Sequence, residues 1–79
     1  MQEKINRLRW QCRRGMLELD ILLLSFLEKH YVGLSAVDQV LFEQLLSYHD
    51  LDLFQYLVKQ EPVAEPLLQK LVEGIYRGY

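Results

Sequence analysis

Apolar residues recur with the helical period along almost the whole of this 79-residue chain, and no segment alternates strictly as a half-buried strand would. We therefore predict an all-α fold, a compact five-helix bundle that forms a single domain over residues 1–79. The helical pattern is interrupted at Gly15, at Val32-Gly33, around His49-Asp50 and at Glu61-Pro62. The five helices are expected at about residues 4–14, 16–31, 35–48, 51–60 and 66–77.

Local signals define the expected helix ends. Gly15 can adopt the left-handed conformation that ends a helix. Ser35 and Asp38 have the spacing of a capping box, and Asp50 is a suitable N-cap for the fourth helix. Pro66 fits the first position of the fifth helix, because its missing N–H is not needed there. These signals predict helices with short connections between them.

The apolar side chains indicate which helix faces form the core. The second helix is apolar on two faces, which is typical of a helix at the centre of a core. One face holds Met16, Leu19, Leu23, Phe26 and Leu27, and the other holds Leu17, Ile21, Leu24 and Tyr31. In the third helix the stripe expected to point inward is Val37, Val40, Leu41, Leu45 and Tyr48.

Charge is divided unevenly along the chain. Residues 1–14 hold five basic and one acidic side chain, a net of 5 − 1 = +4, and residues 15–79 hold four basic and ten acidic, a net of 4 − 10 = −6. A basic arm on an acidic body suggests an anionic partner or a contact surface organised by charge. Trp10 lies among the arginines of this arm, where it can anchor an interface or stack a base. Packing of Trp10 on the second helix is the alternative.

The sequence lacks the motifs of an enzyme. A domain of this length hides only about 60% of its unfolded surface, which leaves little room for an enclosed site. There is no GxGxxG or phosphate-loop pattern, no His or Cys pair at metal-ligand spacing, and no serine with a local base. We expect a protein that is not an enzyme and that binds no metal or cofactor of its own.

The lone Cys12 and the short apolar runs bear on the compartment. One cysteine cannot form an internal disulfide, which fits a reducing environment. Cys12 is expected to be a small packed residue on a helix, with activation of its thiol by Arg13 and Arg14 as the alternative. The longest apolar run, residues 21–24, is far shorter than the roughly 20 residues that span a bilayer. We expect a cytoplasmic monomer without direct membrane insertion.

Residues 13–20 place unlike side chains closest together. Arg14 is expected to end the first helix and Glu18 to lie in the first turn of the second, each favourably placed on its helix dipole. Gly15 between them has no side chain, so the backbone of another protein can approach. The alternative is a purely structural corner with a glycine stop and a local Arg14–Glu18 ion pair. These residues alone leave both readings open.

The run Trp10-x-Cys12-Arg13-Arg14-Gly15-Met16-x-Glu18-Leu19-Asp20 resembles the RGxxE signature of the FAD assembly factors of succinate dehydrogenase. Three further features match in order, so that the resemblance extends from about residue 5 to residue 75. They are Phe26, Leu34-Ser35 and Asp50-x-Asp52-Leu53-Phe54-x-Tyr56-Leu57. Tyr56 stands where many relatives carry Trp, which is a conservative change for packing.

The resemblance implies a helper of another protein. Members of this family bind the flavoprotein subunit of succinate dehydrogenase, and often that of fumarate reductase, and promote covalent attachment of FAD to a histidine of that subunit. The flavin would be held by the partner. The resemblance carries over Arg14, Gly15 and Glu18 as partner-binding residues, with Arg13, Met16 and Asp20 as flanking contacts. Trp10 joins this set for its interface chemistry.

Two other classes of function remain open at this point. One is a small helical nucleic-acid-binding or antitoxin-like module that uses the basic first helix, although the acidity of the whole chain argues against a nucleic-acid partner. Its binding would weaken steeply with salt and with the loss of Arg7 and Arg9. The other is a scaffold that stabilises a membrane-associated complex without affecting its flavin.

Overall fold

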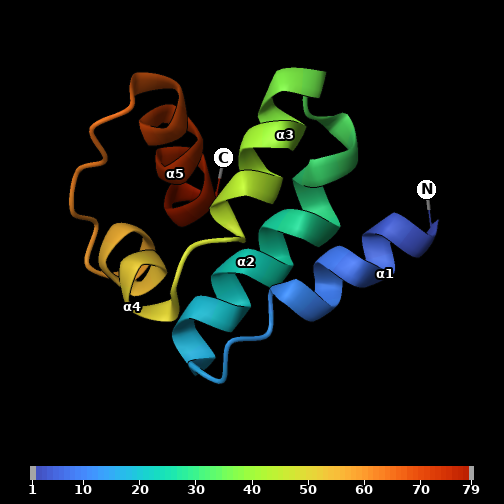
Figure 1. Cartoon of the computed structure of the whole chain (residues 1–79), viewed down its shortest axis with the longest axis horizontal. Coiled ribbons are helices and arrows are strands. Elements are labelled where there is room, and N and C mark those ends of the chain that lie inside the picture. The colour runs from blue at the N-terminus through green and yellow to red at the C-terminus, as the bar shows by residue number, and fades with distance from the viewer. Residues whose placement is uncertain (1, 79) are drawn as a thin grey trace.

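The computed structural model describes residues 2–78, and within them the chain is helical with no strand (Figure 1). The all-α fold with five helices is therefore confirmed. The elements are α1 (Gln2–Gln11), α2 (Leu17–His30), a 3₁₀ turn η1 (Tyr31–Gly33), α3 (Ala36–Leu45), α4 (Asp50–Leu53), a π-helical turn η2 (Phe54–Val58) and α5 (Pro66–Arg77).

Helix α2 is the centre of the fold. It contacts α1, α5 and η2, and α3 packs on α5, so that α1 and α5 lie on opposite sides of the molecule (Figure 1). Its core face is the predicted one, with Leu19 and Leu23 completely buried. Leu17 and Ile21 on the second face are 78% and 57% exposed, so the expectation that both faces are covered is wrong for these two residues.

An aromatic cluster joins α2, η1 and α3. The ring centroid of Phe42 lies 5.4 Å from that of Phe26 and 5.7 Å from that of Tyr31. The Tyr31 hydroxyl donates to Glu43 at 2.5 Å, and Lys4 of α1 pairs with the same carboxylate at 3.0 Å. Burial and this hydrogen bond raise the pKa of Tyr31 to about 12, and the hydrogen bond holds the pKa of Glu43 below its usual value. The cluster ties α1 to α3 across η1.

The first helix ends three residues earlier than predicted. The Arg13 N–H bonds to the Trp10 carbonyl at 3.1 Å and closes the last turn. The next N–H, that of Arg14, donates to the Asp20 carboxylate at 2.8 Å instead of continuing the helix. Gly15 has the predicted left-handed conformation, with φ of 78°, but it lies in the connection beyond the helix. Arg14 is therefore a loop residue and does not end α1.

The third helix begins as predicted but faces the core differently. The Ser35 hydroxyl accepts from the Asp38 N–H at 3.2 Å, which confirms the N-cap. The helix ends at Leu45, not at residue 48. Val37 and Val40 are 59% and 51% exposed, so the predicted inward stripe is wrong at these two residues, while Leu41, Leu45 and Tyr48 pack inward as predicted. The face of α3 that enters the core instead includes Phe42, which is completely buried in the aromatic cluster. The side chains of α3 and its C-cap that are buried are Phe42, Leu45 and Leu46.

The last two helices contrast in how well their starts were predicted. Asp50 is not the N-cap of the fourth helix: His49 holds that position without a side-chain cap bond, and Asp50 is the first helical residue. The prediction for the fifth helix is confirmed, since α5 begins at Pro66 and the Glu65 carboxylate accepts from the N–H groups of Leu67 and Leu68 at 3.1 and 2.9 Å. None of the helices within residues 2–78 is long and apolar enough to cross a membrane.

Candidate functional site

Residues 12–16, which we call the signature loop, connect α1 to α2. The carboxylate of Asp20, one turn into α2, folds back over this loop. Its Oδ1 accepts from the Arg14 N–H at 2.8 Å and its Oδ2 from the Gly15 N–H at 3.2 Å. An acidic side chain is also favoured near the N-terminus of a helix, where the dipole is positive. Asp20 therefore closes the loop and sets its conformation.

The guanidinium of Arg14 points into the molecule, and its side chain is only 15% exposed. Nε donates to the Gln11 carbonyl at 2.7 Å, and Nη1 donates to the Tyr48 carbonyl at 3.1 Å and to Asp50 Oδ1 at 3.2 Å. Nη2 donates to the Leu46 carbonyl. The positive charge thus lies against the carbonyl ends of α1 and α3, where it is favoured. Arg14 joins these two ends to the start of α4.

The Arg14–Glu18 ion pair expected for a purely structural corner does not form within residues 2–78. Arg14 pairs with Asp50 instead. Glu18 lies in the first turn of α2 as expected, and its side chain is exposed. Within residues 2–78 it forms no hydrogen bond or ion pair. Its carboxylate is therefore available to a donor on another molecule.

Gly15 and Met16 occupy opposite environments. Gly15 is exposed, and a Cβ added to it would meet no atom within 4 Å. Its positive φ favours glycine, while the open space outside it leaves the loop backbone accessible. Met16, the N-cap of α2, is half-buried and packs against the core. The loop thus exposes its glycine and anchors itself through the next side chain.

Trp10 and Arg13 form an exposed pair before the loop. Trp10 is 73% exposed, so it does not fold onto α2, and the Arg13 guanidinium lies 5.5 Å from the centroid of its ring. A cation over an indole face is an attractive contact. The pair is a surface with both aromatic and cationic character.

Cys12 is completely buried directly after α1. Burial raises the pKa of its thiol to about 12, although the charge of Arg14 acts in the opposite direction. Activation of the thiol by neighbouring arginines is therefore contradicted. The packed-residue interpretation is correct, except that Cys12 lies in a turn and not in a helix.

Leu17 and Leu51 are exposed apolar residues that were not predicted for the site. They are 78% and 72% exposed. Leu17 follows Met16, which packs against the core, and Leu51 follows Asp50, which pairs with Arg14. In the sequence, the Asp50-x-Asp52 run of the resemblance is the signal for the segment that contains Leu51, which forms α4. It did not indicate that Arg14 brings α4 to the loop.

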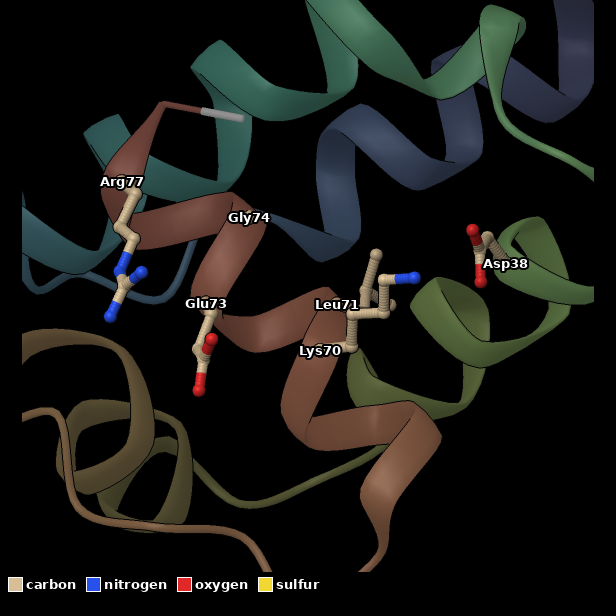
Figure 2. Close-up of a pocket in the computed structure, with 6 residues that line it drawn as sticks. All are labelled: Asp38, Lys70, Leu71, Glu73, Gly74 and Arg77. Carbon is tan, nitrogen blue, oxygen red and sulfur yellow. The ribbon is translucent and has the colours of Figure 1, made fainter.

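A hollow of about 430 Å³ lies elsewhere, between α3 and α5 (Figure 2). Lys70 points toward α3, where Asp38 lies, and Glu73 and Arg77 extend on the other side of α5. None of these residues belongs to the signature. The part of the chain that the structure describes contains no group of three or more His, Cys, Asp or Glu side chains that could hold a metal ion.

Comparison with known proteins decides the family. The sequence model of a family described as the flavinator of succinate dehydrogenase matches residues 6–78. This chain belongs to that family. A relative from Pseudomonas putida, named FAD assembly factor SdhE, is 42% identical over 74 residues, which cover 94% of this chain and 88% of the relative. A relative of the same name from Shewanella oneidensis is 46% identical over 68 residues, which cover 86% of this chain and 83% of the relative.

Membership in the flavinator family confirms the resemblance seen in the RGxxE residues. The family consists of assembly factors and not of catalytic enzymes, so the prediction that this chain is not an enzyme is also confirmed. The match includes the signature loop, α4 and α5 in one stretch. The family match therefore covers the signature residues together with the α4 segment that Arg14 binds.

Proposed function

We propose that this chain promotes covalent attachment of FAD to the flavoprotein subunit of succinate dehydrogenase, and that it binds this subunit through the exposed side of the signature loop. The observation that carries the activity is the family match over residues 6–78. The division of the signature into buried and exposed residues supports the choice of surface.

Arg14 and Asp20 act in this proposal as positioning residues. The donors of Arg14 already serve the carbonyls of α1 and α3 and the carboxylate of Asp50. Both oxygens of Asp20 serve the loop backbone. The two side chains fix the loop before any partner arrives, so little ordering is needed on binding.

Gly15 and Glu18 make the central contacts with the partner. Gly15 lets the backbone of the flavoprotein approach the loop, because no side chain covers it. Glu18 accepts a charge-assisted hydrogen bond from a donor of the partner. Trp10 and Arg13, residue types that often dominate binding energies, add aromatic and cationic anchors close in sequence to these contacts, and Leu17 adds exposed apolar surface.

The helper acts by population shift. It binds best to the conformation of the flavoprotein in which flavin and histidine are aligned, and it thereby raises the population of that conformation. The bond-forming chemistry and the flavin site belong to the partner, so this chain binds no FAD of its own. In the same proposal it acts as a cytoplasmic monomer and also serves the flavoprotein of fumarate reductase.

The test mixes apo-flavoprotein subunit, FAD and a dicarboxylate with and without this chain, and follows covalent flavin by in-gel fluorescence. We expect attachment to be faster with the chain than without it. Equal rates in the two reactions would overturn the proposed activity.

A pair of substitutions at Gly15 tests the proposed surface in the same assay. Gly15→Arg and Gly15→Ala both place a side chain at a φ of 78°, which costs about 1–2 kcal/mol of stability. Only arginine adds bulk where the partner is expected. We expect Gly15→Arg to lose attachment activity and Gly15→Ala to keep most of it, and equal losses would refute close approach of the partner at this glycine.

A further inference from the structure

A groove runs along α2 on the side of the chain that faces η2 and α5. Two hollows of about 260 and 310 Å³ compose it, and they adjoin each other, because Ile21, Leu22 and Tyr76 line both. Ile21 is 57% exposed, and the other two side chains are half-buried. The middle of the groove is therefore an accessible apolar strip.

The two ends of the groove carry opposite charge. The first hollow includes Glu18 of the signature, and the second includes Lys29 and Arg77. None of these three charges forms an ion pair within residues 2–78. At a rise of about 1.5 Å per residue, α2 separates Glu18 from Lys29 by about 16 Å.

We propose that this α2–α5 groove receives an apolar segment of the flavoprotein subunit that has a carboxylate at one end and a basic side chain at the other. The inference rests on the proposed function and extends its contact surface from the signature loop along α2. Opposite charges at the two ends give the segment a direction. A span of about 16 Å corresponds to roughly five residues of extended chain.

The cationic end suits one carboxylate better than the diphosphate of a nucleotide. Lys29 is in the last turn of α2 and Arg77 is in the last turn of α5, so both lie at helix C-termini. The carbonyl ends there carry partial negative charge, whereas diphosphates are bound at helix N-termini. Peptide binding is therefore the proposal, and binding of FAD is an outcome that the experiment can detect.

Site-specific photocrosslinking tests the proposal in the complete chain. We place p-benzoylphenylalanine at Ser25, which lines the groove, at Leu17 beside the signature loop, and at Val40 on the exposed face of α3 as a control. Each variant is irradiated with apo-flavoprotein subunit, and the products are mapped by mass spectrometry. We expect crosslinks from positions 17 and 25, and none from position 40.

Three other outcomes bear directly on the proposal. Crosslinks from position 17 without any from position 25 would overturn the groove while leaving the proposed function intact. If the unmodified chain does not accelerate FAD attachment, the proposed function itself is overturned, whatever the crosslinks show. Crosslinks from position 25 to a second copy of this chain would overturn a flavoprotein segment as the occupant.

Charge reversal supplies a second, independent measurement. Lys29→Glu with Arg77→Glu should weaken binding of the flavoprotein subunit at least tenfold, with less effect at high salt, where charges are screened. Lys59→Glu with Lys70→Glu changes the net charge by the same amount outside the groove and should leave binding within about twofold. Equal losses from the two pairs would overturn the proposal, as would saturable FAD binding by the chain alone that the first pair abolishes.

Discussion

The signature loop and helix α5 are held in place by different kinds of contact. The ends of α5 are determined by its immediate neighbours: Glu65 caps the first N–H groups, and Gly78 ends the helix in the left-handed conformation. The loop depends on Arg14, whose partners at Leu46, Tyr48 and Asp50 are 32 to 36 residues away. The docking of α3 and α4 consequently adds contacts to the loop beyond the local ones that Asp20 and Gln11 supply.

This difference indicates how a small helper can present a rigid surface. The connection from α1 to α2 has little regular structure, and connections of this kind are usually mobile. Arg14 and Asp20 make it part of the folded core, while Gly15 and Glu18 remain outside. Four neighbouring signature residues thus divide into two that hold the loop and two that face solvent.

Replacement of Arg14 by alanine should have the largest effect on stability. It leaves carbonyls at the ends of two helices and the Asp50 carboxylate without their donor, and we expect a loss of about 2–4 kcal/mol. Urea unfolding followed by circular dichroism measures it. The matched control is Arg13→Ala, which removes only an exposed cation–π contact and should stay within about 1 kcal/mol. Equal losses would show that Arg14 does not hold the loop.

The buried thiol at the start of the loop predicts a pH effect on the stability of the chain. Burial raises the pKa of Cys12 from 9.0 to about 12, so the folded chain keeps this proton to higher pH than the unfolded chain does. The resulting stability is present below about pH 9 and is lost as the pH rises toward 12, with a slope of at most about 1.4 kcal/mol per pH unit for one group.

Unfolding between pH 8 and 11 measures this slope. Cys12→Ala should flatten it, and Tyr31→Phe should flatten what remains, because the pKa of Tyr31 is also raised to about 12. A slope that is unchanged in both variants would contradict the burial of these two groups.

Loss of the Glu65 cap should have a smaller and local effect. Glu65→Ala removes the acceptor for two N–H groups of α5, which costs about 1 kcal/mol. Hydrogen exchange should accelerate at Leu67 and Leu68 and stay unchanged at Arg14 and Gly15. Faster exchange at the loop amides as well would show that the two regions are not independent.

The same contrast explains which parts of the fold were predictable. The Ser35 cap and the whole of α5 followed from residues three or four positions apart, where sequence and structure are directly linked. The end of α1 depends on the side chain of Asp20, and the face that α3 presents depends on the packing of Phe42 against Phe26 and Tyr31. Contacts of this kind between separate segments leave no local signal.

The candidate site was predictable as a set of residues but not in its arrangement. The RGxxE resemblance selected Arg14, Gly15 and Glu18 together. That Arg14 turns inward could not be predicted, because most of its partners are backbone carbonyls, which no side-chain pattern identifies. Cys12 was correctly expected to be packed, since a small apolar thiol in a helical stripe is normally buried.

Substitution of Glu18 by alanine tests the central claim most directly. This side chain is exposed and forms no hydrogen bond or ion pair with the described residues 2–78, so the unfolding free energy should change by less than about 0.5 kcal/mol. The measurement is the rate of covalent FAD attachment to the flavoprotein subunit, with fully folded variant compared with unmodified chain at equal concentration. We predict at least a tenfold lower rate at subsaturating concentrations, equivalent to the loss of about 1.4 kcal/mol of binding. An unchanged rate with unchanged stability would contradict the assignment of the exposed signature residues to the partner.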